Sequence, residues 1–330
     1  MSKQWILKNR PEGMPKDTDF ELREVELEEL QQGEVKIKNR YISVDPYMRP
    51  KMSVLEGSYT EAYAINAVID GLAIGKVVES RSEAFEKGDV VVNYSGWVTE
   101  AVVSEDSLTK VDLNGLTEAQ YLSVLGMTGA TAYFGLLHVA AARPGETVFV
   151  SAAAGAVGST VVQIAKALGM TVIGSAGGAE KVKFVKSLGA DQVLDYKAEE
   201  DVLTQLKRLA PAGIDVYFDN VGTDHLDAAF GHAKINARFA ICGMISGYNK
   251  AAALELKNFT QIIAKRIRVT GFLYRDFKDD LPEFHAQMSL WLKKGLVKDK
   301  YTEVAGIDNV IEAFKGLFTG DNTGKMLVRL

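Results

Sequence analysis

Two glycines that follow a short apolar run are the residues most clearly placed for chemistry. They lie in residues 147–158, TVFVSAAAGAVG, where the apolar run predicts a strand and residues 156–168 predict a helix that follows directly. A strand that turns through Gly155 and Gly158 into a helix presents backbone N–H groups and the positive end of the helix dipole. Because such an end attracts anions, the segment is a candidate seat for the pyrophosphate of a dinucleotide.

The glycine pattern and the residues beyond it bear on which dinucleotide binds. The G-x-G-x-x-G fingerprint falls on Ala153, Gly155 and Gly158, with alanine at the first glycine, so the motif alone could equally be a turn without a ligand. Residues 174–179, GSAGGA, contain no acid to bind the ribose hydroxyls of NAD. Lys181 follows, and a cation there favours the 2′-phosphate of NADP, although a single lysine could also be an ordinary surface residue.

Alternating strand and helix patterns continue from this turn to residue 272 and predict a parallel sheet covered on both faces, the doubly wound nucleotide-binding fold. The expected strands are residues 147–152, 171–175, 192–196, 216–220, 238–242 and 268–272, and the expected helices are residues 157–168, 181–188, 199–209, 224–233 and the region of 258–265. A helical run at residues 118–138 should precede the first strand.

The two ends of the chain predict a second domain. Residues 1–120 carry short β patterns, such as those at 20–27 and 34–43, and glycines separate them, which predicts a small barrel or sandwich. Within this region residues 43–52, SVDPYMRPKM, are expected to be irregular because they contain two prolines. After helices at residues 281–294 and 310–318, a closing strand at 325–330 is expected to return to this domain.

Composition limits the partners. The 330 residues carry a net charge of −5 and no sustained basic patch, which argues against nucleic acid or an anionic membrane as a general partner. No stretch approaches the roughly 20 apolar residues that a bilayer span needs, and no signal-peptide core is visible, so we expect a cytoplasmic protein. Cys242 is the single cysteine and the four histidines are scattered, so we expect no bound metal.

Six segments occur in one order along the chain: SVDPYMRPKM, VLGMTGATAYFGLL, AAAGAVGSTVVQIAKALG, FDNVG, CGMISGYN and GDNTGKMLV. On these segments the whole chain resembles the zinc-independent medium-chain dehydrogenase/reductases. Within them it is similar to the leukotriene B4 12-hydroxydehydrogenase/prostaglandin reductase branch, with plant alkenal double-bond reductases and bacterial curcumin reductases. The resemblance implies an α/β fold: a doubly wound parallel Rossmann domain that binds NADP at residues 121–294, and a mostly-β GroES-like barrel domain at residues 1–120 and 295–330 for catalysis and substrate.

Family roles carry over to matching positions of this sequence. Lys181 and Tyr196 resemble the pair that holds the 2′-phosphate and the adenosine ribose. The pyrophosphate turn corresponds to Gly155, Ala156, Val157 and Gly158. The remaining contacts to ribose and nicotinamide correspond to Asn220, Cys242, Gly243, Met244, Ile245, Ser246, Gly247, Tyr248, the backbone of Phe272 and Leu273, and Asn322. The segment GDNTGK that contains Asn322 is one residue short of a P-loop and leads into a strand, so from the residues alone it is no phosphate cradle.

The resemblance also implies a reaction. The Gly-His-Glu segment and four-cysteine lobe of zinc-dependent relatives are absent, and oxidation of an unactivated alcohol then lacks a Lewis acid. Reduction of the carbon–carbon double bond of an α,β-unsaturated aldehyde or ketone demands less. Hydride from NADPH goes to the β-carbon, and hydrogen-bond donors and ribose hydroxyls stabilise the enolate. Tyr47 and Tyr248 are the candidate catalytic donors, because a tyrosine with an ordinary pKa near 10 is neutral at pH 7.

Substrate class and alternatives complete the prediction. Some eicosanoid-acting members carry a tyrosine on the helix near residues 258–265, but this chain reads NFTQIIAK there, which favours smaller or aromatic enones. Tyr59 and Tyr63 are further candidates for the substrate side. We expect a homodimer. NADPH-dependent quinone reduction and a non-catalytic NADPH-binding scaffold are the alternative functions.

Overall fold

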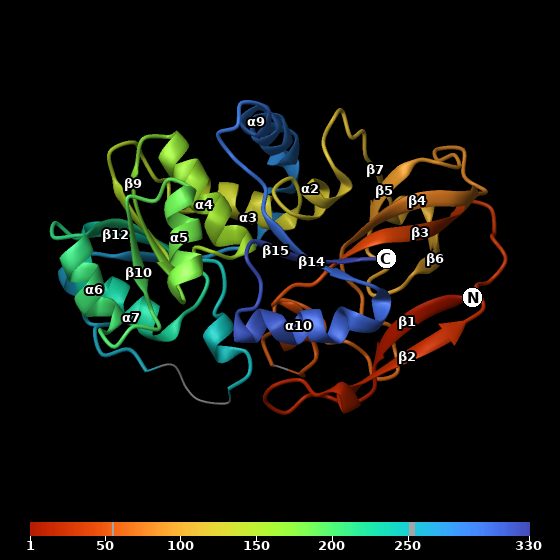
Figure 1. Ribbon diagram of the computed structural model, residues 1–330, viewed down its shortest axis with the longest axis horizontal. Coiled ribbons are helices and arrows are strands. Elements are labelled where there is room, and N and C mark those ends of the chain that lie inside the picture. Colours follow the sequence, from red (N-terminus) through yellow and green to blue (C-terminus); the bar gives the residue numbers. More distant parts are fainter. Residues whose placement is uncertain (55, 251–254) are drawn as a thin grey trace. The chain divides into compact units, whose positions relative to one another are not determined.

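The chain divides into two compact units in a computed structural model that describes residues 1–54, 56–250 and 255–330 (Figure 1). The first unit is Met1–Leu122 with Tyr301–Asn322 and Met326–Leu330. The second is Ser123–Lys300 with the short segment Thr323–Lys325. The C-terminal part of the chain therefore contributes to both units.

A six-stranded parallel sheet forms the centre of the second unit. Its strands are β8 (Thr147–Val150), β9 (Thr171–Ala176), β10 (Gln192–Asp195), β11 (Ile214–Asp219), β12 (Ala233–Ile241) and β13 (Arg268–Gly271). Their order across the sheet is β10-β9-β8-β11-β12-β13. The sheet thus grows outward in both directions from β8 and β11, which confirms the predicted doubly wound fold and puts its switch point between these two strands.

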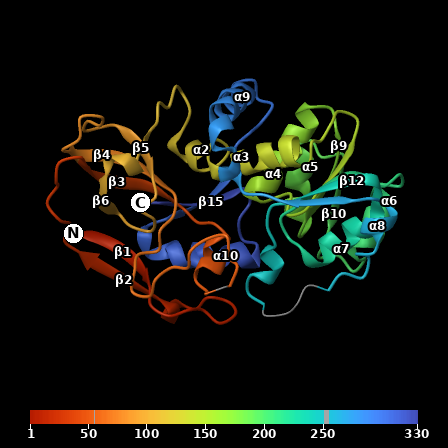
Figure 2. The same cartoon turned by 180° about the vertical axis from the view of Figure 1, so that it is seen from behind.

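Helices cover both faces of this sheet. They are α3 (Met127–Phe134), α4 (Ala156–Ala167), α5 (Ala179–Ser187), α6 (Val202–Leu209), α7 (Thr223–His232), α8 (Gln261–Ala264) and α9 (Leu281–Lys293). Helices α6 and α7 pack together on the face where the rings of Phe149 and Tyr217 stack with centroids 5.1 Å apart. The short α8 packs beside α7 (Figure 2). Helix α3 packs against α4.

The single helical run predicted at residues 118–138 is wrong. Helix α2 (Glu118–Leu122) ends early, and α3 begins only after Gly126, whose backbone is extended. A Cβ on Gly129 would lie 1.8 Å from the carbonyl oxygen of Val124, so the turn between the helices folds tightly under α3. The backbone then widens into a π-helical turn at Gly135–Val139. Apolar periodicity did not reveal this close approach.

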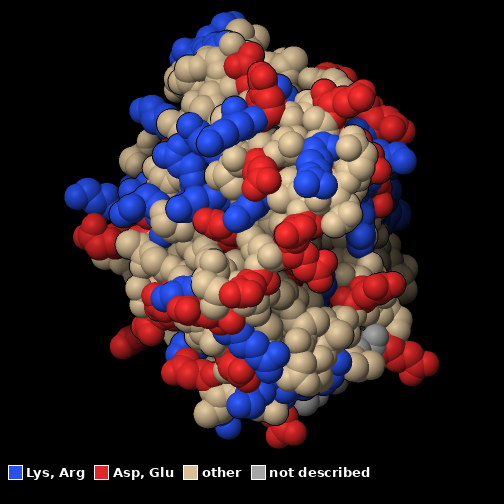
Figure 3. Space-filling model, turned by 90° about the vertical axis from the view of Figure 1, so that its right-hand side faces the viewer, with Lys and Arg blue, Asp and Glu red and all other residues tan. Residues whose placement is uncertain are grey.

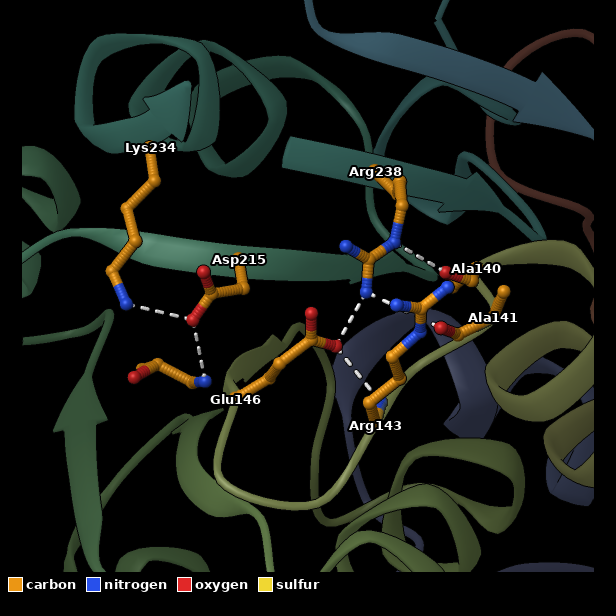
Figure 4. Close-up of polar contacts among 8 residues, drawn as sticks. Ala140, Ala141, Arg143, Glu146, Asp215, Lys234 and Arg238 are labelled. Carbon is orange, nitrogen blue, oxygen red and sulfur yellow. Dashed lines mark hydrogen bonds and ion pairs between the residues drawn. The ribbon is translucent and has the colours of Figure 1, made fainter. Parts of the chain in front are cut away.

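A polar cluster fixes the amino ends of β8, β11 and β12 (Figure 4). Arg238 on β12 donates to the carbonyl oxygen of Ala140 at 2.6 Å and pairs with Glu146, which directly precedes β8. Asp215 on β11 accepts from the backbone N–H of Thr147 at 2.8 Å and pairs with Lys234 at 2.7 Å. Since ligands of such sheets bind at the carboxyl ends, this cluster stabilises the sheet and leaves the opposite edge for chemistry.

The first unit is mostly β structure, as predicted, and corresponds to the GroES-like barrel. Its main sheet has the order β14-β15-β3-β4-β5-β7, β6 pairs with β3, and β1 pairs with β2. The strands are β1 (Ser2–Leu7), β2 (Phe20–Val25), β3 (Glu34–Ser43), β4 (Ala73–Ser80), β5 (Val90–Asn93), β6 (Glu100–Ser104), β7 (Thr109–Lys110), β14 (Tyr301–Ala305) and β15 (Lys325–Arg329). Helix α10 (Val310–Thr319) brings Phe314 against the fully buried Trp97, with ring centroids 5.4 Å apart.

The segment SVDPYMRPKM is more regular than predicted, because it contains the one-turn helix α1 (Met48–Lys51). Pro50 falls in the first turn of α1, where its missing N–H would have no intrahelical partner and its fixed φ suits a helix. Tyr47 is the residue that caps this helix. The short helix therefore fixes the backbone that carries Tyr47.

Acidic and basic side chains are interspersed on the face shown in Figure 3, in keeping with the net charge of −5. In the first unit, Lys36 and Lys38 on β3 pair with Glu100 on the neighbouring β6, at 3.6 and 3.9 Å. Exposed pairs of this kind contribute at most about 1 kcal/mol each. Within the described ranges no helix is long and apolar enough to cross a membrane.

Candidate cofactor and active site

The predicted pyrophosphate turn leads from β8 into α4. Gly155 caps α4 with an extended backbone, and no side chain caps the first N–H groups of the helix. Ala152 has a left-handed φ of 46°, which is uncommon for alanine. A Cβ on Gly158 would lie 2.3 Å from the carbonyl oxygen of Ala152, so only glycine permits this approach of helix to turn. The turn thus has the open helix end and the close backbone packing that an anion site needs.

A segment from the far end of the chain lies directly against this turn. The N–H of Gly324 donates to the carbonyl oxygen of Ala154 at 2.8 Å, and Gly324 forms a β-bridge with Gly155. Gly324 has a φ of 71°, and a Cβ on it would lie 1.9 Å from the carbonyl oxygen of Lys300. The short segment Thr323–Lys325 therefore supports the predicted pyrophosphate turn within the second unit. Asn322 comes two residues earlier and belongs to the first unit.

The predicted adenosine contacts lie where β9 and β10 end. The Asp195 carboxylate accepts from the N–H groups of Gly178 and Lys197, both at 2.9 Å, and so ties the turn after β9 to the turn after β10. The Tyr196 ring, which is 42% exposed, lies over Gly177, where a Cβ would be 2.6 Å from Cζ and Oη. Lys181 lies in the first turn of α5, directly after this tied turn.

The ring of His225 packs against the Tyr196 ring. Its own ring makes an edge-to-face contact with Tyr196 at 5.6 Å and stacks near Phe149. Its Nε2 lies 2.7 Å from the Ser175 hydroxyl. Burial lowers the pKa of His225 to about 4, so this histidine is neutral at physiological pH. Sequence reasoning missed both Asp195 and His225, because neither has a motif that marks it.

The predicted ribose and nicotinamide contacts lie at the switch point. Asn220 follows β11, and its Nδ2 donates to the Ser151 carbonyl oxygen at 2.8 Å at the end of the neighbouring β8. The segment Cys242 to Tyr248 follows β12 and is attached to the turn after β11. The N–H groups of Cys242 and Gly243 donate to the carbonyl oxygen of Asp219, at 2.9 and 3.1 Å. These contacts bring Asn220 and the residue 242–248 segment together within the second unit.

Within this segment the hydroxyl oxygen of Tyr248 accepts from the backbone N–H of Met244 at 3.3 Å. Tyr248 is therefore held over its own loop. The Phe272 ring makes an edge-to-face contact with Phe218 at 6.2 Å. Both backbone groups of Leu273 are hydrogen-bonded to Asp276, which leaves less scope for a backbone contact from Leu273 to a cofactor.

Tyr47, the other candidate donor, lies in the first unit. Burial, followed by the nearby Asp45 carboxylate, raises its pKa far above the ordinary value, so its hydroxyl is always protonated. A neutral phenol can donate a hydrogen bond to a developing oxyanion. Tyr63 already donates its hydroxyl to the Asp70 carbonyl oxygen at 2.8 Å, and Tyr59 is 52% exposed. Tyr47 is thus better suited than either to act as a donor.

The donor set does not fit a zinc ion. In the part of the chain that the structure describes, no three His, Cys, Asp or Glu side chains gather where they could hold a metal. Burial raises the pKa of Cys242 to about 12, which keeps its thiol protonated, whereas zinc binds the thiolate.

Comparison with known proteins identifies the family. The profile for the N-terminal domain of oxidoreductase matches residues 3–111, and the profile for zinc-binding dehydrogenase matches residues 156–289. The chain is 42% identical to 2-alkenal reductase (NADP(+)-dependent) of Nicotiana tabacum, over 99% of this chain and 97% of that protein. It is 38% identical to NADPH-dependent curcumin reductase of Escherichia coli (strain K12), over 100% of this chain and 97% of that protein.

Among solved structures, CurA from Vibrio vulnificus in complex with NADPH superposes with a TM-score of 0.94 at 38% identity. The match covers 99% of this chain and 98% of that chain. The fold and site define a dinucleotide-binding dehydrogenase/reductase of the medium-chain type. The chain belongs to the medium-chain dehydrogenase/reductase family, in the branch that holds the alkenal, curcumin and prostaglandin reductases.

Proposed function

We propose that this protein is an NADPH-dependent oxidoreductase that reduces the carbon–carbon double bond of small α,β-unsaturated aldehydes or ketones. The observation that carries the proposal is the match over 99% of the chain to a protein named 2-alkenal reductase. The open amino end of α4, with Gly158 and Gly324 packed closely around the turn, supports dinucleotide binding. NADP is favoured over NAD because residues 174–179, which precede Lys181 by one residue, contain no acid to bind the ribose hydroxyls of NAD.

The cofactor is proposed to bind along the carboxyl edge of the parallel sheet. The residue 155–158 turn would hold the pyrophosphate, Lys181 and Tyr196 the adenosine end, and Asn220 with the residue 242–248 segment the nicotinamide end. Asn322 and the backbone of Phe272 would complete the site. In this proposal residues 121–294 bind NADP, and residues 1–120 with 295–330 carry the substrate side.

Bound NADPH supplies the hydride that reaches the β-carbon of the substrate. Negative charge then develops on the carbonyl oxygen, and a neutral donor placed there lowers the barrier. Tyr47 fits because its buried hydroxyl stays protonated. Tyr248 fits because its oxygen already accepts from Met244, which polarises the hydroxyl as a donor.

The test is a turnover assay with matched tyrosine variants. Purified protein is given NADPH with cinnamaldehyde, nonenal, curcumin or a quinone, and the loss of NADPH absorbance is followed. We expect enones and enals to be reduced faster than the quinone. Loss of a single oxyanion donor should lower kcat by about 100-fold in Tyr47→Phe or Tyr248→Phe.

Tyr121→Phe is the control, because its hydroxyl donates to the Asp112 carbonyl oxygen elsewhere in the first unit. Binding of NADPH without reduction of any activated alkene would refute the proposed reaction and support a scaffold. Faster turnover of the quinone would instead support the quinone reductase alternative. Wild-type kcat in both tyrosine variants would remove them from the mechanism.

We further propose that the protein forms a homodimer through β13. This strand ends the sheet order, and all four of its residues are exposed. Val269 on the strand is 40% exposed and Ile263 on the preceding helix α8 is 79% exposed, and an exposed apolar edge strand is prone to pair with another chain. Light scattering should give twice the chain mass, and Val269→Lys should halve it. A monomeric wild-type protein would refute this.

We also propose a cytoplasmic location, which cell fractionation tests.

A further inference from the structure

Asp219, the last residue of β11, has an unusual environment. Its side chain is fully buried, and one carboxyl oxygen, Oδ1, accepts four hydrogen bonds while Oδ2 has no partner among the described residues. The donors are the Ser151 hydroxyl at 3.2 Å, the Tyr217 hydroxyl at 2.7 Å, and the N–H groups of Val221 and Gly222 at 2.9 and 2.8 Å. The group therefore has a demanding geometry that the proposed chemistry does not use directly.

The contacts of Asp219 join the two strands at the switch point. Ser151 directly follows β8, and its hydroxyl also accepts from the backbone N–H of Asn220 at 2.8 Å. The Ser151 carbonyl oxygen receives the Asn220 side chain. Removal of the Asp219 acceptor would leave the Ser151 hydroxyl with the longer bond to the Phe218 carbonyl oxygen, at 3.3 Å, and would so loosen the hydroxyl that holds the backbone of Asn220.

The same carboxyl oxygen shapes the turn after β11. It receives the N–H groups of Val221 and Gly222, and Gly222 and Thr223 both have positive φ values, 79° and 41°. A non-glycine residue with a positive φ is costly and persists only where its surroundings hold it. The carboxyl oxygen supplies part of that restraint.

The turn at residues 220–222 also holds the loop that follows β12. The Asn220 carbonyl oxygen accepts from Ile245 at 3.3 Å. The Val221 carbonyl oxygen accepts from the backbone and the hydroxyl of Ser246, at 3.2 and 2.5 Å. The loop that bears Tyr248 is thus built on peptide groups whose orientation Asp219 fixes.

A buried carboxyl destabilises the fold when one of its oxygens has no hydrogen-bond partner, because that oxygen has lost its contact with water. Burial also raises the pKa of Asp219 despite its four donors. Its advantage is that one oxygen gathers four donors from two strands, which fixes several groups to a common point. This gain is in geometry rather than in stability.

We propose that Asp219 is a positioning residue for the nicotinamide half of the cofactor site, acting through Ser151 and the turn at residues 220–222 on Asn220 and on the loop that bears Tyr248. This inference rests on the proposed cofactor site for its binding readouts and on the proposed reaction for its kinetic readout. The adenosine half, at the ends of β9 and β10, is linked to this turn through the backbone N–H of His225, which donates to the Gly222 carbonyl oxygen at 3.2 Å, so it should depend on Asp219 less than the nicotinamide half does.

The experiment compares two ligands that report on different halves of the site. NADPH occupies both halves, whereas 2′,5′-ADP reports on the adenosine half alone. For Asp219→Ala we expect about a tenfold loss of NADPH affinity, consistent with one or two lost hydrogen bonds, while 2′,5′-ADP affinity stays within about twofold. The kcat for an enone should fall further than the affinity. Asp219→Asn keeps the Oδ1 acceptor and should recover most of both.

Asp215→Asn is the matched control, because Asp215 lies at the amino end of the same strand and also accepts from a backbone N–H. It should leave both affinities and kcat unchanged. If Asp219→Ala does not fold, Ser151→Ala takes its place and should show the same selective loss of NADPH affinity.

Equal losses for NADPH and 2′,5′-ADP would overturn the inference, since they would mean general damage to the domain. Unchanged NADPH affinity in the folded variant would overturn it as well. If the wild-type protein reduces no enone, the proposed reaction fails, but the two binding measurements still decide the role of Asp219.

Discussion

Gly177→Ala should weaken the binding of the adenosine end of NADPH while it leaves the free energy of unfolding nearly unchanged. An added Cβ would lie 2.6 Å from Cζ and Oη of Tyr196, whereas carbon atoms in contact prefer about 3.5–4.0 Å. The ring must therefore retreat by about 1 Å. It has room to do so, because Tyr196 is 42% exposed. The predicted partner of the adenosine ribose would then point away from its ligand.

We expect a small change in the free energy of unfolding and a larger change in NADPH affinity. Gly177 lies outside the left-handed region, so alanine meets no backbone strain and reduces the entropy of the unfolded chain, which stabilises by about 0.4–1 kcal/mol. Displacing an exposed ring offsets this, and the free energy of unfolding should change by less than about 1 kcal/mol. A lost or distorted hydrogen bond to the cofactor should cost about 1–1.5 kcal/mol, or roughly a five- to tenfold rise in the NADPH Kd.

Fluorescence titration of NADPH measures the affinity, and urea unfolding measures the stability. Reduced nicotinamide mononucleotide, which lacks adenosine, should be used by the variant as well as by the wild type. In a Tyr196→Ala background the effect of Gly177→Ala should vanish, because the clash acts through that ring. A Kd that is unchanged, or an equal loss in the Tyr196→Ala background, would refute the reasoning.

Three further substitutions test the support of the pyrophosphate turn, a buried carboxyl outside the candidate site, and the preference for NADPH. Gly324→Ala forces a Cβ to within 1.9 Å of the Lys300 carbonyl oxygen at a φ of 71°, so thermal unfolding should show a loss of about 2–4 kcal/mol. Burial raises the pKa of Asp299 to about 6 from 3.8, so ionisation costs stability as pH rises through this interval and the cost persists above it. Asp299→Asn should therefore match the wild type near pH 4 and be more stable at pH 7.5 in urea unfolding, by at most about 3 kcal/mol. Lys181→Ala should weaken NADPH binding by about 10- to 150-fold and NADH binding little, and titration of both checks this.

Patterns along the chain predicted the sheet well where a strand is a short apolar run closed by small or polar residues, as in β8, β9 and β11, whereas β12 begins at Ala233, five residues before the predicted start at 238. Strand β9 and helix α4 lie within a residue or two of the expected bounds. The errors share a physical cause. The break before Gly126 and the one-turn helix after Tyr47 depend on close contacts and on a proline in a first turn, and hydrophobic periodicity carries no information on either.

Residues of the candidate site could be predicted only where a local sequence pattern marks the residue that would contact the cofactor. Lys181 and Tyr196 follow strand ends in chain order, so the doubly wound topology gave them a place. Asp219 and Ser151 are 68 residues apart and meet because β8 and β11 are neighbours at the switch point. No local pattern marks such a pair, and only the paired strands reveal it.

The pyrophosphate turn has the clearest motif in the sequence, yet its geometry also depends on a contact that the motif does not include. The fingerprint counts Ala153, Gly155 and Gly158, and an alanine at its first position weakens the match. The structure explains how the turn remains tight, because Gly158 admits the Ala152 carbonyl oxygen from within the motif and Gly324 closes on Ala154 from the far end of the chain. Two glycines some 160 residues apart in sequence therefore constrain one anion-binding turn, so a substitution at Gly324 should impair the turn as surely as one inside the fingerprint.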